Sequence, residues 1–185
     1  MDEYLSHIER LDELDSPELI NNSSTEHAIP LVAKLFARGR KEILVFTGSL
    51  DPKIYAQKPV IDALGVFLVG RSGKLSVLIQ KDATEVSDAT IATSESGLIS
   101  ALRSEYGSDV VDSNITVRRV CDRTRKAAKQ HFLVVDNKGF RFEPDNTKHE
   151  AVASFNMPKV ANGLTETFNQ HLVDSCVMAL PQTKQ

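Results

Sequence analysis

The sequence predicts an α/β protein in which a mixed sheet is flanked by helices on both faces. Segments with helical periodicity alternate along the chain with short apolar segments, an order typical of α/β sandwiches. The apolar segment at 43–47 contains no alternating polar residues until its end, as expected of a strand that helices cover on both sides. A chain of 185 residues with 41% hydrophobic side chains is long enough to bury one core.

Each expected element has its own sequence signature. Helices are predicted where apolar residues recur every three or four positions, and strands where short apolar runs end at turn residues. Pro30 either starts or bends the second helix, and Gly39 is suited to ending it. Residues 137–139 are a turn that makes 140–143 the return strand of a hairpin. In chain order we expect helices around 4–14 and 25–39 with a loop at 21–24 between them, a strand at 43–47, a helix at 59–70, a strand at 75–79, a loop at 84–96, a helix at 97–106, strands at 115–120, 131–135, 140–143 and 151–155, and a helix at 158–177.

We expect an N-terminal helix and linker at 1–24, one domain at 25–180 and a tail at 181–185.

Composition and charge exclude several classes of protein. A net charge of −3 argues against a generally basic nucleic-acid coat, and no apolar run approaches the roughly 20 residues of a membrane helix. The acidic start does not resemble a secretory signal, and two cysteines without metal-ligand spacing indicate reduced thiols. We therefore expect a cytoplasmic protein with no membrane segment, no cofactor and no metal.

One segment combines a polar entrance, an apolar strand and a terminal carboxylate. Lys129 and His131 precede the run 132–135, Asp136 follows it, and Ala153-Ser154-Phe155-Asn156 comes later. These segments resemble the phospholipase D superfamily motif, His-x-Lys-x-x-x-x-Asp followed by Gly-Ser-x-Asn, with lysine and histidine exchanged and alanine in place of glycine. The order of the surrounding elements agrees, so that the resemblance covers about residues 25–177.

The resemblance implies a phospholipase D-like fold and a specific chemistry. In that family a histidine attacks phosphorus to form a phospho-enzyme, a second histidine protonates the leaving group, and lysines hold the phosphate oxygens. The chemistry needs two motifs, and single-motif members obtain the second by dimerising. This chain has one motif, so the resemblance implies a symmetric homodimer. If the protein is active, His131, Lys129 and Asp136 would be its catalytic residues.

The exchanged pair argues against the standard reaction. A lysine amine with a pKa of about 10.4 is protonated at neutral pH and is a poor nucleophile. His131 would attack from a position displaced by two residues, roughly 6–7 Å along a strand, whereas a displacement of about 1 Å can cost about a hundredfold in rate. The interval between Asp136 and Ser154 is also longer than is usual in the family. We expect the fold to be kept, with Lys129, His131, Ser154 and Asn156 forming one phosphate-binding pocket.

Further residues are candidates for ligand binding. The segment 118–129 is strongly basic and leads into the motif; it is expected either to contact a phosphate backbone without reading base sequence or to be a solvated loop paired with acids elsewhere. Arg141 and Glu143 share one face of their strand, so they either orient His131, bind ligand or form an ion pair. The loop at 47–52 follows a strand and could line a pocket. The basic residues of 118–129 are Arg118, Arg119, Arg123, Arg125, Lys126 and Lys129, of which Arg123 and Arg125 are counted among the ligand-binding candidates.

Three hypotheses follow. The leading one is a phospholipase D-like homodimer with a degenerate site that binds nucleic acid or a nucleotide without standard turnover. The second is an active, metal-independent phosphodiesterase or nuclease that uses His131 across a dimer interface. The third is a protein-interaction module with a vestigial site, in which the apolar face of the N-terminal helix docks a partner.

Overall fold

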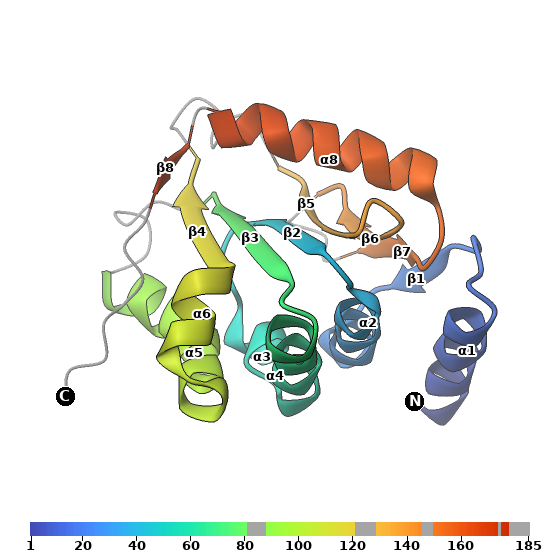
Figure 1. The fold of residues 1–185 in the computed structure, drawn as a ribbon. Coiled ribbons are helices and arrows are strands. Elements are labelled where there is room, and N and C mark those ends of the chain that lie inside the picture. The colour runs from blue at the N-terminus through green and yellow to red at the C-terminus, as the bar shows by residue number, and fades with distance from the viewer. Residues whose placement is uncertain (81–87, 121–128, 146–149, 174, 178–185) are drawn as a thin grey trace.

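The computed structural model describes residues 1–80, 88–120, 129–145, 150–173 and 175–177. They form one mixed eight-stranded sheet in the order β1-β7-β6-β5-β2-β3-β4-β8. Helices α1 to α6 lie on one face of the sheet and α8 crosses the other (Figure 1). The elements are α1 Asp2–Glu13, β1 Ile20–Asn22, α2 Thr25–Arg38, β2 Glu42–Thr47, α3 Pro52–Tyr55, α4 Lys58–Gly65, the π-helical turn η1 Val66–Gly70, β3 Lys74–Ile79, α5 Asp88–Tyr106, α6 Ser108–Asn114, β4 Ile115–Arg119, β5 His131–Val135, β6 Gly139–Glu143, β7 Ala151–Ser154, α8 Pro158–Val173 and β8 Cys176–Val177. The predicted α/β sandwich is confirmed.

The sheet has a parallel part and an antiparallel part. Strands β2, β3 and β4 run parallel, whereas β5 pairs antiparallel with β2 and starts a meander through β6 and β7. In such a meander the first and third strands run in the same direction. The end of β7 therefore lies toward the end of β5, not toward its start.

The core has two layers, which explains the unbroken apolar sequence of β2. Ile43 and Val45 join the larger cluster on the side of α1 to α6. Leu44 and Phe46 join a smaller cluster with Phe168 of α8. Because side chains alternate between the two faces of a strand, a strand buried on both faces must be apolar at every position.

Several predicted boundaries were wrong. Helix α5 begins at Asp88, so most of the loop predicted at 84–96 is helical, and the closing helix ends at Val173 instead of 177. Part of the linker predicted at 21–24 is strand β1, which pairs with β7. Pro30 lies inside α2. Helices α3 and α6 and strand β8 were not predicted.

The N-terminal helix packs on its own domain. Ile8 and Leu11 of α1 are buried, and Tyr4 stacks on His27 of α2 with ring centroids 4.0 Å apart. The apolar face that the interaction-module hypothesis needed is thus covered within the chain. Within the described ranges, no helix is both long and apolar enough to cross a membrane.

Candidate functional site

A small pocket of about 190 Å³ opens at the carboxyl end of β2, on the sheet face that carries α3. The start of β5, the end of β6 and the loop after β2 form its walls, as expected for the loop at 47–52. Its position follows from the register, which sets His131 opposite Glu143 and Leu133 opposite Arg141. The lining residues are Phe46, Thr47, Gly48, Ser49, Asp51, Ile54, Tyr55, His131, Phe132, Leu133, Arg141 and Glu143.

Both ring nitrogens of His131 face specific neighbours. The backbone N–H of Gly48 donates to its Nε2 at 3.0 Å. Nitrogen Nε2 is therefore the acceptor of a neutral ring, and the proton resides on Nδ1. Nδ1 lies 4.0 Å from the Glu143 carboxylate. This arrangement fixes the ring against the loop that follows β2.

A buried ion pair forms the floor of the pocket. Arg141 Nη1 lies 3.4 Å from Glu143 Oε2, and Arg141 Nε donates to the side-chain oxygen of Asn22 at 2.7 Å. Both charged side chains are about nine-tenths buried. Two of the alternatives raised by the sequence therefore occur together: Arg141 and Glu143 form an ion pair, and Glu143 faces His131.

Tyr55 supplies a neutral hydroxyl to the same pocket. Burial raises its pKa to about 12, Arg141 opposes that rise, and Glu143 and Asp51 add to it. The phenol therefore stays protonated at neutral pH and can donate a hydrogen bond to an anion. The pocket thus combines a guanidinium, a phenol and a neutral imidazole beside one buried carboxylate.

The raised pKa of Tyr55 predicts a loss of stability in alkali. The folded protein keeps a phenolic proton that the unfolded chain releases near pH 10, so the stabilisation is present below pH 10 and is lost as the pH rises toward 12. Two pKa units correspond to about 3 kcal/mol. We expect urea denaturation from pH 9 to 11.5 to show a shallower decline for Tyr55→Phe than for the wild type. Equal declines would contradict this assignment.

The structure does not bring all predicted site residues into this pocket. Lys129 is exposed and precedes β5, and it is absent from the pocket wall. Ser154 pairs with Phe140 near the opposite end of the meander, where Asn156 Nδ2 donates to the backbone and carboxylate oxygens of Asp15 at 3.1 Å. The expectation of one pocket containing both segments is corrected: the antiparallel meander separates them.

The side chain of Asp136 links two segments of the fold. Asp136 has a φ of 50° and Asn137 has a φ of 53°, left-handed values at the two central residues of the turn that the Lys138 N–H closes on the Val135 carbonyl. Its carboxylate accepts the backbone N–H groups of Arg40, Lys41 and Glu42 at 2.6 to 2.9 Å. Asp136 therefore ties the β5–β6 turn to the connection between α2 and β2.

The basic segment is only partly described. Arg123, Arg125 and Lys126 lie outside the described residues, so their predicted contact with a ligand stays a prediction. Arg118 donates to the hydroxyl and carbonyl oxygens of Ser175 at 2.7 and 2.9 Å and so joins β4 to the segment after α8. Within the described residues, no three His, Cys, Asp or Glu side chains gather as metal ligands.

Sequence reasoning missed two contributors to the pocket, Tyr55 and Asn22, and it predicted the loop at 47–52 without the hydrogen bond from Gly48 to His131. A signal for Tyr55 was readable, since Asp51-Pro52 is a typical helix start and the Asp51 carboxylate caps α3 through the Lys53 N–H. Asn22 and Gly48 carry no such signal, because their roles depend on neighbours distant in sequence.

The fold is that of the phospholipase D-like proteins. Nuc from Salmonella typhimurium, a phospholipase D family member, is similar with a TM-score of 0.59 and 17% identity, over 88% of this chain and 99% of Nuc. NucT from Helicobacter pylori gives a TM-score of 0.56 and 11% identity, over 87% of this chain and all of NucT (100%). TrmBL2, an archaeal chromatin protein, gives a TM-score of 0.53 and 13% identity over 94% of this chain. This chain spans only 60% of TrmBL2. At such identities the similarity shows the fold alone.

The particular family is defined by sequence. The chain belongs to the family described as a domain of unknown function, DUF7931, whose model matches residues 24–176. No curated protein matches the chain. The resemblance to the phospholipase D superfamily is thus confirmed at the level of fold.

Proposed function

We propose that this protein is a phospholipase D-like homodimer with a degenerate active site, which binds a phosphate-bearing ligand, nucleic acid or nucleotide, without standard turnover. The observation that carries the proposal is the hydrogen bond from the Gly48 N–H to His131 Nε2. We also propose that the protein acts in the cytoplasm, where its two cysteines would stay reduced.

The state of His131 argues against nucleophilic attack. An attacking ring nitrogen needs a lone pair directed at phosphorus, and the lone pair of Nε2 is directed at a backbone N–H. Nδ1 carries the proton and faces Glu143. Lys129 cannot compensate, because it lies outside the pocket and a protonated amine does not attack.

The charges of the pocket favour a phosphodiester over a phosphomonoester. Arg141 supplies a planar guanidinium suited to phosphate oxygens. Its hydrogen bonds to Asn22 and Glu143 are made by Nε and Nη1. Glu143 opposes the second negative charge of a monoester. A singly charged diester group, as in a nucleic-acid backbone or a cyclic nucleotide, fits this balance better. The structural similarity to the chromatin protein TrmBL2, described by its mode of DNA binding, supports a role of this fold in binding.

The test compares binding with turnover. We expect fluorescence anisotropy to show binding of labelled single- or double-stranded oligonucleotides, with affinity reduced at least fivefold by Tyr55→Phe combined with His131→Ala, which removes two neutral polar groups of the pocket wall, since a neutral hydrogen bond contributes about 0.5–1.5 kcal/mol. Arg10→Ala, which removes an exposed cation of α1, is the matched control and should bind like the wild type. Bis(p-nitrophenyl) phosphate should not be hydrolysed above the rate of His131→Asn, with or without EDTA.

Other outcomes would decide between the hypotheses. Hydrolysis abolished by His131→Asn would replace this proposal with the active phosphodiesterase. No binding of any oligonucleotide or nucleotide, or binding unchanged in the double variant, would reject it. Sedimentation at micromolar concentrations should show a dimer, and a monomer throughout would remove the homodimer from the proposal.

A further inference from the structure

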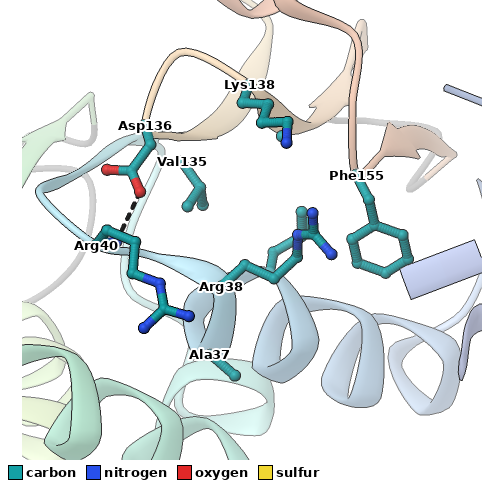
Figure 2. A pocket seen from close by; sticks show the side chains of 9 residues that line it. Ala37, Arg38, Arg40, Val135, Asp136, Lys138 and Phe155 are labelled. Atoms are coloured by element: carbon teal, nitrogen blue, oxygen red, sulfur yellow. Dashed lines mark hydrogen bonds between the residues drawn. The ribbon is translucent and has the colours of Figure 1, made fainter. Parts of the chain in front are cut away.

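A second cavity, of about 340 Å³, lies at the opposite end of β5 and β6 from His131. Its walls come from the end of α2, the β5–β6 turn and Phe155 after β7. Three basic side chains line it: Arg38, Arg40 and Lys138. In Figure 2 the Lys138 amine is directed into the space between Arg40 and Phe155. Two parts of the chain that are distant in sequence, the end of α2 and the β5–β6 turn, therefore bring positive charge to one hollow.

The charges around this cavity are not balanced by its own lining. Asp136 is the one acidic residue among the lining residues, and its carboxylate already accepts three backbone N–H groups. Arg40 is exposed, and within the described residues its guanidinium has no hydrogen-bonding partner. The five N–H donors of Arg40 are thus available to a bound anion.

The neighbouring cations are held by a carboxylate from the N-terminal segment. Asp15, which follows α1, is bound by Arg38 and by Lys138, whose amine lies 2.6 Å from Oδ2. Asn156 Nδ2 is the third donor to this carboxylate, at 3.1 Å from Oδ2. The hydrogen bond from Lys138 lowers the pKa of Asp15, and Arg38 adds to the effect. The side chains of Arg38, Lys138 and Asn156 therefore form a set of hydrogen-bond donors suited to an anion. Asp15 of the same chain occupies part of this set.

The backbone of Asp15 is consistent with this reading. Its φ is 49°, a left-handed conformation that costs a non-glycine residue energy. That conformation aims the carboxylate at Arg38 and Lys138. Asp15 thus acts as an internal counter-ion whose position depends on how α1 is docked.

We propose that the cavity lined by Arg38, Arg40 and Lys138 is a second anion site that binds the phosphate group of a small ligand, with Asp15 as its internal competitor. Arg40 and the free N–H groups of Lys138 would hold the phosphate directly. Because Arg38 is already paired with Asp12 and Asp15, and Lys138 with Asp15, the positive charge left for a ligand is chiefly that of Arg40, which one negative charge of a phosphate group balances. This site does not depend on the proposed function, because it shares no residue with that pocket.

Inorganic phosphate is the probe that tests this site. Isothermal titration of the full chain, at constant ionic strength set with chloride, should show saturable binding. Arg40→Ala should weaken it at least tenfold, the loss expected for one charge-assisted contact. Asp15→Asn, which removes the competing charge but keeps the side-chain size, should strengthen it several-fold. Arg10→Ala should leave it unchanged.

The variants separate a site from a general charge effect. Arg40 is exposed, so its alanine variant should fold, and circular dichroism checks this. Saturable binding that responds to Arg40→Ala but not to Arg10→Ala supports the site. Absence of saturable binding in both the wild type and Asp15→Asn, or equal weakening by Arg10→Ala and Arg40→Ala, would overturn it.

Discussion

Replacing Asp136 by alanine is expected to lower the free energy of unfolding by about 4 kcal/mol. Three backbone N–H groups, those of Arg40, Lys41 and Glu42, lose their acceptor. A charge-assisted hydrogen bond contributes about 1.5–3 kcal/mol to stability. Here water can replace the carboxylate, so we take roughly 1 kcal/mol for each of the three bonds. Alanine in the left-handed conformation of this turn adds about 1 kcal/mol.

Urea denaturation of two further variants separates the contribution of the hydrogen bonds from that of the backbone conformation. Asp136→Asn keeps one acceptor oxygen and tolerates the left-handed backbone, so it should cost about half as much as alanine. Asp136→Gly loses the carboxylate but removes the backbone strain, so it should lie between the two. If Asp136→Ala unfolds at the wild-type urea concentration, the structural role assigned to this carboxylate is wrong.

This role changes how the motif should be weighed. The aspartate of Lys129-x-His131-x-x-x-x-Asp136 was predicted to be catalytic if the protein is active, yet its oxygens are already occupied by the connection between α2 and β2. A residue needed for the fold gives no information about turnover. The chemistry therefore has to be judged from His131, Arg141 and Glu143 alone.

The elements that the sequence predicted well are those with an unambiguous apolar pattern. Strand β2 and helix α2 bury nearly every apolar residue that the pattern assigned to them. Strand β1 was not predicted because Asn21 and Asn22 have low strand propensity. Asn22 is nevertheless buried and accepts a hydrogen bond from Arg141, a tertiary contact that no local pattern reports.

The candidate site was predictable at His131 and at the Arg141–Glu143 pair, but not as a whole. Spacing along one strand determines which residues share a face, and this correctly grouped Arg141 with Glu143. Spacing between strands does not determine register. The long interval between Asp136 and Ser154 was visible, but whether it shifts Ser154 toward or away from His131 depends on where β7 pairs with β6.

Replacing Arg141 by alanine is expected to cost about 3–5 kcal/mol of folding stability and to abolish binding in the His131 pocket. The substitution leaves Glu143 buried without its cation, and it leaves the side-chain oxygen of Asn22 without its donor. An uncompensated buried charge is among the most destabilising changes that a single substitution can make. Loss of binding in this variant alone would therefore not distinguish recognition of a ligand from loss of the fold.

A double variant resolves this ambiguity. Arg141→Met combined with Glu143→Gln removes both charges and approximates the volume, so thermal and urea denaturation should return to within about 1–2 kcal/mol of the wild type. If Arg141 binds phosphate, the refolded double variant should still fail to bind oligonucleotides. Recovery of binding together with stability would mean that the ion pair only supports the pocket. The ligand would then have to be held by groups other than this guanidinium.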